Sequence, residues 1–180
     1  MKNNILKESI IMVFIILLFT CVIAGVSAND NATNILTLSK GGIVMNYPSD
    51  WGYSQATSND SIMAISKLDS IDSQGVGQVN INIEKRAIDT DLNTFLNKTY
   101  TSMEHDTSFQ LVSSGEVAMG DKVAYEYIYI SKDNGVQREH KAVWFEKGDQ
   151  AYVVMYSAPV NQFDQNSYIF DYVLSELKIT

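Results

Sequence analysis

The sequence predicts an α+β fold, in which antiparallel strands are combined with two helices. Three observations predict it. Apolar residues recur at every second position through most of the chain after residue 41, as they do in strands that bury one face. In two other segments they recur three and four positions apart, which is the period of an amphipathic helix. Short turns join neighbouring strand segments directly, and this favours antiparallel pairing.

Three strands are expected before the first helix, at residues 42–47, 61–68 and 78–85. The third alternates most clearly, because Val79, Ile81 and Ile83 point to one side and polar residues point to the other. Pro48 ends the first strand, since proline cannot donate a hydrogen bond to a β-ladder. Residues 48–52 are therefore expected to form a turn.

The period changes after residue 88, and residues 91–104 are predicted to form the first helix. Asp91 offers a capping oxygen, and apolar residues follow it at helical spacing. Short turns then join four strands into a meander, at residues 111–119, 123–131, 137–147 and 151–158. Pro159 stops the last of them, and residues 161–177 carry their apolar side chains on one side, which predicts the second helix.

The first 28 residues have the layout of a secretory signal or a membrane anchor. Lys2 and Lys7 precede an apolar run, and the run ends in small residues that predict signal-peptide cleavage after Ala28. The apolar run is longer than the usual apolar core of a signal peptide, which has about 7–15 residues. It approaches the length of a membrane-spanning helix, about 20 residues, so retention of this segment as a membrane anchor is an alternative to cleavage. Attachment of a lipid at Cys21 is a third alternative.

The chain is therefore predicted to consist of a leader at residues 1–28, a polar linker at 29–40 and one domain at 41–180. Positive charges before the apolar run would leave the domain outside the cytoplasm in the anchored case as well. The predicted location is therefore extracytoplasmic, either secreted or held at the outer face of the cytoplasmic membrane. Membrane contact is expected only through the N-terminal segment.

The composition excludes several classes of function. The chain has 13 basic and 21 acidic residues and a formal net charge of −8, which disfavours nucleic acid as a partner. Its only cysteine is Cys21, in the leader, so the domain has no disulfide framework and no thiol nucleophile. No phosphate-binding glycine loop, nucleophile elbow or dinucleotide fingerprint occurs, and neither a cofactor nor a catalytic residue is expected.

Some polar residues could nevertheless carry a function. His105 and His140 could share a metal with nearby carboxylates, but no ligand spacing supports such a site. Asp69 and Asp72 could bind calcium, although their loop lacks the terminal glutamate of an EF-hand loop. Among three glycosylation sequons, the one at Asn31 is the best candidate because it lies in the predicted linker.

Tyr125, Tyr127 and Tyr129 share one face of a meander strand and are the candidate interface residues of the domain. Tyrosine is enriched at interfaces because it joins an apolar ring to a polar tip. The alternative is that these rings pack beneath a helix with their hydroxyl groups at the rim. Both alternatives stay open at this point.

Several segments in succession resemble the PsbP-like domain family over residues 42–179. These are Tyr47-Pro48-x-x-Trp51 at the end of the first strand, Ile62-Met63-Ala64, Val79-Asn80-Ile81, and the helix, meander and final helix. The resemblance implies a central antiparallel sheet sandwiched between helices, with Tyr47, Pro48 and Trp51 as a packing motif. The founding member is an extrinsic subunit of photosystem II, but a shared fold does not transfer its function. The leader here is too apolar for a plastid transit peptide, so the resemblance implies a secreted, prokaryotic-type relative.

The sequence thus favours a non-enzymatic extracytoplasmic module that binds other envelope or cell-surface proteins. Two alternatives remain: a small secreted metal-dependent hydrolase, and a surface module that binds carbohydrate or another ligand. The hydrolase requires His105 and His140 to lie close together. The ligand-binding module requires an exposed aromatic cleft.

Overall fold

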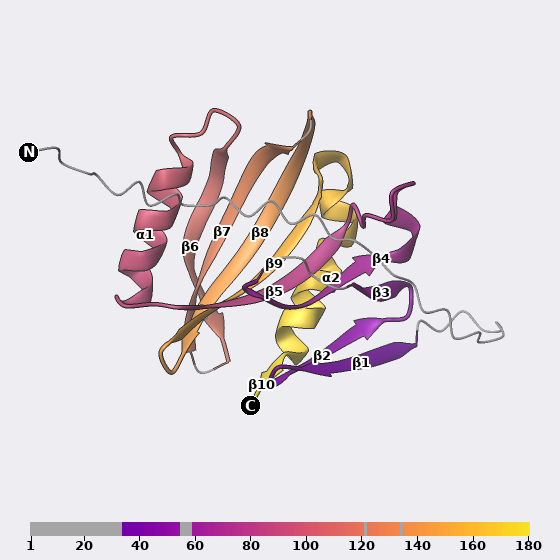
Figure 1. Cartoon of the computed structure of the whole chain (residues 1–180), viewed down its shortest axis with the longest axis horizontal. Coiled ribbons are helices and arrows are strands. Elements are labelled where there is room, and N and C mark those ends of the chain that lie inside the picture. The colour runs from indigo at the N-terminus through magenta and orange to yellow at the C-terminus, as the bar shows by residue number, and fades with distance from the viewer. Residues whose placement is uncertain (1–33, 55–58, 121, 134) are drawn as a thin grey trace, which may run out of the picture.

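The computed structural model describes residues 34–54, 59–120, 122–133 and 135–180. These residues form two antiparallel sheets and two α-helices, as shown in Figure 1. The predicted leader, its cleavage site at Ala28, Cys21 and the sequon at Asn31 lie outside the described residues. Within the described part of the chain, neither helix is long and apolar enough to cross a membrane.

The larger sheet has seven strands in the order β3-β4-β5-β9-β8-β7-β6. In that order the strands are Trp51–Ser54, Ser61–Lys67, Asn80–Ala87, Gln150–Pro159, Val136–Lys147, Lys122–Asp133 and Gln110–Met119. All neighbours pair antiparallel, and β6 to β9 form the predicted meander. The smaller sheet has the order β1-β2-β10, with strands Ile35–Lys40, Ile43–Pro48 and Lys178–Ile179.

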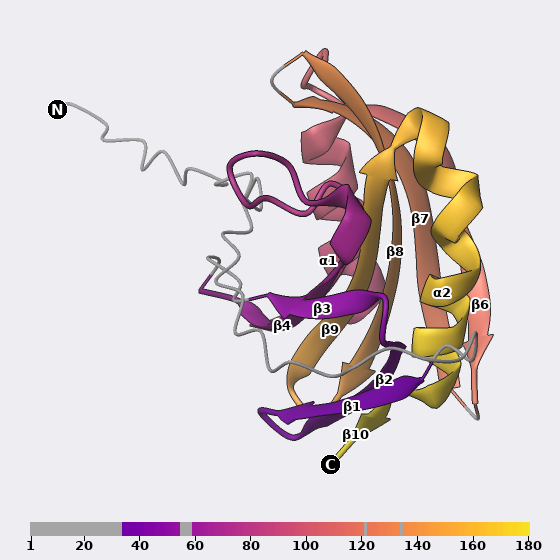
Figure 2. The ribbon, with the colours of Figure 1, turned by 90° about the vertical axis from the view of Figure 1, so that its right-hand side faces the viewer.

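The two helices cover opposite faces of the seven-stranded sheet. Figure 2 shows the sheet nearly edge-on, with α1 (Leu92–Met103) on one side and α2 (Phe163–Glu176) on the other. Along the chain, α1 follows β5, and α2 follows β9. The described residues also include two short 3₁₀ turns, at Leu68–Ser70 and Val160–Gln162. The α+β fold with a central antiparallel sheet between helices is therefore confirmed.

The larger core lies between the sheet, α2 and the β1–β2 hairpin. Phe170 of α2 is fully buried, and its ring lies 6.2 Å from that of Tyr156 on β9, measured between centroids. The Tyr156 hydroxyl donates a 2.8 Å hydrogen bond to the backbone oxygen of Phe163, so the start of α2 is tied to the sheet. Alternate residues of β9 face this core, which is why its apolar positions recur with period two.

The smaller core lies beneath α1 and is largely aromatic. Tyr100 of α1 stacks on Tyr127 of β7 with 3.7 Å between ring centroids, and its hydroxyl accepts a 3.0 Å hydrogen bond from Nε1 of Trp144. Asp91 caps the helix, since its Oδ1 accepts a 2.9 Å bond from the backbone nitrogen of Thr94. The predicted first helix is therefore present within one residue of its expected bounds at both ends.

Three strands were not predicted. The polar composition predicts a linker at residues 29–40, but residues 35–40 form β1, which pairs along its whole length with β2 through a turn at Gly41 and Gly42. Both glycines have positive φ values, of 59° and 79°. Nearly all of β1 is exposed, so it lacks the alternation that marks a half-buried strand. Trp51 and Gly52, expected in a turn, begin β3, and the final residues form β10.

A polar network crosses the α1 face of the sheet beside the aromatic core. His140 of β8 lies between two serines, with 2.8 Å from its Nε2 to Oγ of Ser131 and 2.7 Å from its Nδ1 to Oγ of Ser157. Its ring also stacks on Tyr129, at 4.6 Å between centroids. Burial, together with the positive charge of Arg138, lowers the pKa of His140 to about 3. The imidazole is therefore neutral near neutral pH and joins three strands as a hydrogen-bonding group.

Phe170→Ala should destabilise the protein strongly, because it removes a fully buried ring from the core between α2 and β9. The expected loss in the free energy of unfolding is about 3–5 kcal/mol. Urea denaturation measures it. Tyr168→Ala on the same helix is the matched control, since Tyr168 is 64% exposed, and should change stability by no more than about 0.5 kcal/mol. Equal losses in the two variants would contradict this description of α2.

His140→Gln should remove part of the pH dependence of stability. As the pH falls below about 6.5, the unfolded chain takes up a proton at this imidazole before the folded protein does. Its contribution is therefore complete above pH 6.5 and declines toward pH 3, by at most about 1.4 kcal/mol per pH unit. Denaturation curves at pH 7 and pH 5 give the pH dependence of stability in each protein. His105→Gln, which changes an exposed histidine, is the control; an unchanged slope in His140→Gln would contradict the prediction.

Candidate functional site

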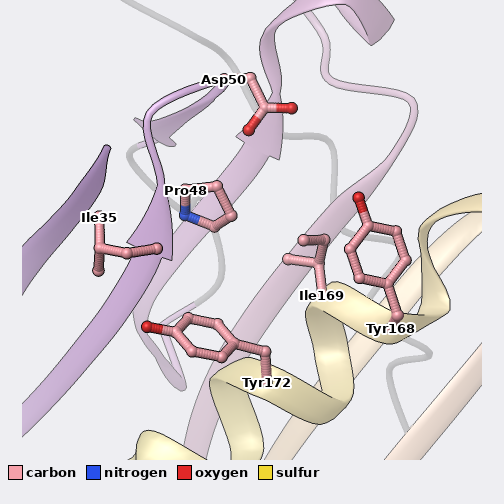
Figure 3. Close-up of a pocket in the computed structure, with 6 residues that line it drawn as sticks. All are labelled: Ile35, Pro48, Asp50, Tyr168, Ile169 and Tyr172. Carbon is pink, nitrogen blue, oxygen red and sulfur yellow. The ribbon is translucent and has the colours of Figure 1, made fainter. Parts of the chain in front are cut away.

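A shallow groove lies between the β1–β2 hairpin and α2, and Figure 3 shows the side chains that line it. Its volume is about 270 Å³. The lining residues are Ile35, Pro48, Asp50, Tyr168, Ile169 and Tyr172. They come from three parts of the chain: the start of β1, the end of β2 with the turn that follows it, and the middle of α2.

The turn from Tyr47 to Trp51 forms one wall of the groove. Tyr47 and Trp51 are both buried in the core between the sheet and α2, and Trp51 is only 1% exposed. The backbone between them is held from two sides. The nitrogen of Ser49 donates a 2.7 Å hydrogen bond to the oxygen of Asn34, and the oxygen of Asp50 accepts a 2.9 Å bond from Leu68. The turn therefore presents Pro48 and Asp50 to the groove from a fixed backbone.

One face of α2 forms the opposite wall. Ile169 is buried, while Tyr168 is 64% exposed. Tyr168 and Tyr172 lie one turn apart, so their rings project from the same side of the helix. In Figure 3 the Tyr172 side chain extends from α2 toward Ile35, across the floor of the groove.

The lining of the groove is mostly apolar and aromatic. Apolar side chains and two phenol rings make up most of its lining, and Asp50 supplies the single charge among the lining residues. The lining contains no histidine, lysine, cysteine or serine that could pair with this carboxylate as a nucleophile or base. Tyrosine rings at a partly exposed apolar surface are typical of residues that carry binding energy at protein interfaces.

The predicted packing motif borders this groove, but the two groove tyrosines were missed. Pro48 lines it, and Tyr47 and Trp51 anchor its wall, as described above. Tyr168 is exposed on the second predicted helix, and Tyr172 lies at the margin of its apolar stripe. The available signal was this pair of aromatic residues four positions apart, one of them outside the stripe.

The row of Tyr125, Tyr127 and Tyr129 lies on the sheet face that α1 covers. Tyr129 is 8% exposed, and Tyr127 stacks on Tyr100 of the helix. Tyr125 and Tyr127 are partly buried at the margin of the same core. The rings therefore lie beneath α1, as in the alternative in which they pack beneath a helix. An interface role for them remains a prediction.

The candidate metal ligands are used in other ways. Both ring nitrogens of His140 lie within hydrogen-bonding distance of serine hydroxyls, and His105 is exposed after the end of α1. In residues 34–54, 59–120, 122–133 and 135–180, no three histidine, cysteine, aspartate or glutamate side chains are grouped to hold a metal ion.

The loop that includes the proposed calcium ligands is closed by its own hydrogen bonds. Oδ1 of Asp72 accepts bonds from the backbone nitrogens of Gln74 and Val76, at 2.8 and 2.9 Å, and its Oδ2 accepts one from Nε2 of Gln78 at 2.8 Å. These donors, with the bond to Val76 first, hold the pKa of Asp72 below its usual value. The carboxylate therefore stabilises its own loop.

Comparison with solved structures shows the same fold in several bacterial proteins. Cyanobacterial PsbP (CyanoP) from Synechocystis sp. PCC 6803 is 16% identical, with a TM-score of 0.59 over 87% of this chain and 99% of that one. LpqN of Mycobacterium tuberculosis, described as involved in cell envelope biogenesis, is 17% identical, with a TM-score of 0.57 over 83% and 92%. PA94 of Pseudomonas aeruginosa, a protein of unknown function, is 9% identical, with a TM-score of 0.51 over 79% and 94%.

No curated protein matches the sequence. The family described as PsbP-like protein matches residues 10–179, which is nearly the whole chain. This match agrees with the resemblance carried by the Tyr47-Pro48-x-x-Trp51 turn and by the order of strands and helices. The chain therefore belongs to the PsbP-like protein family.

Proposed function

We propose that this protein is a non-enzymatic extracytoplasmic module that binds another protein of the cell envelope or cell surface. The groove between the β1–β2 hairpin and α2 is its contact site. The observation that carries this proposal is the exposure of large apolar groups there: Tyr168 is 64% exposed and Ile35 is 50% exposed. Soluble domains bury such groups where they can, so apolar side chains gathered at one surface indicate a contact with a partner.

The composition of the groove supports a protein partner. Interfaces are enriched in tyrosine and depleted of charged residues at their centre, and the groove has two tyrosines and one carboxylate. Its base is rigid, because Ile169 is buried in the core and the Tyr47–Trp51 turn is pinned by backbone bonds on both sides. Because this surface is preformed, fewer of its groups have to be ordered when a partner binds, and the entropic cost of binding is lower.

The predicted leader and the family support an extracytoplasmic location. Lys2, Lys7 and the apolar run up to Ala28 predict export, whether or not the leader is then cleaved. LpqN, which shares the fold, is described as involved in cell envelope biogenesis. Fold likeness does not carry that role over, but a related location is consistent with the leader of this chain.

A carbohydrate or other small ligand is the second candidate for the same groove. The observation in its favour is the combination of two aromatic rings and a carboxylate, from Tyr168, Tyr172 and Asp50. The groove is small for this purpose, since its volume of about 270 Å³ lies below the about 300–1,000 Å³ of most ligand pockets. A protein surface that needs no enclosing cavity therefore fits the groove better.

Site-specific photo-crosslinking tests the proposed function. A photoreactive residue that replaces Tyr168 in the full chain, expressed in its own cells, should form a covalent adduct with an envelope or surface protein. The same residue at Val136, which is 49% exposed and lies in the β7–β8 hairpin, is the matched control and should give no such adduct. Mass spectrometry identifies the captured protein.

The double variant Tyr172→Ala with Asp50→Ala should reduce capture through position 168 at least about tenfold, because truncating central interface residues typically has effects of this size. A denaturation curve like that of the unaltered protein would show that the fold is intact. Adducts of equal yield at positions 168 and 136 would contradict the proposal. Binding of the purified protein to a glycan array, lost on Tyr168→Ala, would favour the carbohydrate alternative.

A further inference from the structure

The groove between the β1–β2 hairpin and α2 joins apolar surface to a single negative charge. Asp50 carries that charge, and the described residues that line the groove include no lysine or arginine to neutralise it. Asp50 is exposed, so its carboxylate is accessible to a binding partner. Apolar walls beside a carboxylate lower the local dielectric, and this strengthens its attraction for a cation.

The helix that forms the other wall adds negative charge and no positive charge. Asp164, Asp171 and Glu176 lie on α2, and its 14 residues include neither lysine nor arginine. Asp164 precedes Tyr168 by one helical turn, and Glu176 follows Tyr172 by one turn, so both carboxylates flank the two groove tyrosines. Both carboxylates are on exposed residues. The groove therefore lies in a region of negative potential.

Elsewhere on α2, the same kinds of group already hold a cation. The Nζ atom of Lys141 lies 5.2 Å from the centroid of the Phe170 ring and 2.9 Å from Oδ1 of Asp171. One ammonium group is thus held by an aromatic ring and a carboxylate at once. The groove offers two tyrosine rings and the Asp50 carboxylate, but no cation among its described lining residues.

Figure 3 shows how these groups are arranged along the groove. The Asp50 side chain and the Tyr168 hydroxyl group lie toward the same end of the groove. The Tyr172 ring extends toward Ile35 at the other end. The charge and much of the apolar surface are therefore at different ends, so a well-matched occupant needs a cationic side chain and apolar side chains together.

We infer that the occupant of the groove is a short segment of the partner protein in which a lysine or arginine lies beside apolar residues; this rests on the function proposed above. The cation pairs with the Asp50 carboxylate and lies over the Tyr168 ring. The neighbouring apolar side chains pack against Tyr172 and Ile35. The net charge of −8 steers a cationic segment toward this chain and disfavours a second copy of the chain as the occupant.

Selection of short random peptides displayed on phage, with the purified full chain as the target, tests this inference. The peptides retained are those that bind the unaltered protein but not Tyr168→Ala. They should share a lysine or arginine beside apolar residues. A synthetic copy of such a peptide should bind about 5- to 30-fold more weakly when its basic residue is replaced by glutamine, because the ion pair and the cation–π contact are lost together. Fluorescence anisotropy measures the dissociation constant.

Reversing the charge at position 50 makes the same test on the protein. Asp50→Lys should weaken binding of the peptide about 5- to 30-fold, and a peptide with glutamate in place of the basic residue should bind this variant better than it binds the unaltered protein. Asp50→Asn, which removes the charge without reversing it, should weaken binding in the same direction. Denaturation curves show that each variant is folded.

Glu104→Lys is the matched control. It makes the same change in charge at an exposed position at the end of α1, which covers the opposite face of the sheet from α2. At that distance salt screens the added charge, so the dissociation constant should change by less than about 2-fold.

Three results would overturn the inference: a selection that retains no peptide, retained peptides without a basic residue, or equal effects of Asp50→Lys and Glu104→Lys. Photo-crosslinking through position 168 tests the proposed function separately. An adduct whose yield is the same with and without Asp50→Lys would keep the groove as the contact site and would overturn only the cationic occupant.

Discussion

The burial of β8 and β9 on both faces is the constraint on which the rest of the structure depends. Side chains of β9 alternate between two cores, so that Tyr156 packs beneath α2 and Val153 packs beneath α1. A strand buried in this way needs a cover on each face and a neighbour on each side to satisfy its backbone. The two helices and the neighbouring strands β5 and β7 meet those requirements.

The same constraint explains the polar groups inside the sheet. A hydroxyl or imidazole on a doubly buried strand must find a partner within the protein, because water does not reach it. His140 and Ser157 solve this by bonding to each other across β8 and β9, and Tyr156 bonds to the backbone at the start of α2. Polar side chains thus fix which residues of adjacent strands face each other, while apolar side chains fix which face is inside.

The sequence predicts those strands and helices in which apolar residues recur at regular spacing. It does not predict the short or exposed strands that are held only by backbone pairing with a neighbouring strand. The seven predicted strands and both helices are present, and all of them except β6 include buried side chains. The strand β1 was assigned to a linker, since it is exposed nearly throughout and is held by its backbone pairing with β2. The same reason applies to β10, whose two residues have no period at all.

The groove could not be predicted from the sequence, because it forms only when folding brings together residues that are far apart in the chain. Ile35 and Tyr168 are far apart in the sequence and lie on different elements, β1 and α2. The resemblance implies a packing motif at Tyr47, Pro48 and Trp51, but the spacing of these residues gives no sign that the turn also faces α2. Pairing of β1 with β2 is what sets Ile35 opposite Pro48, and that strand was itself missed.

The smaller sheet joins the two ends of the domain, and this has a consequence for the timing of folding. The strand β2 pairs with β10, and the nitrogen of Thr180 donates a 2.8 Å bond to the oxygen of Gly42. Buried residues of β2 such as Met45 also share a core with α2. A ribosome therefore releases the N-terminal hairpin long before the segments that it packs against have been made. The domain therefore cannot complete its larger core until the segments that form α2 and β10 have been made.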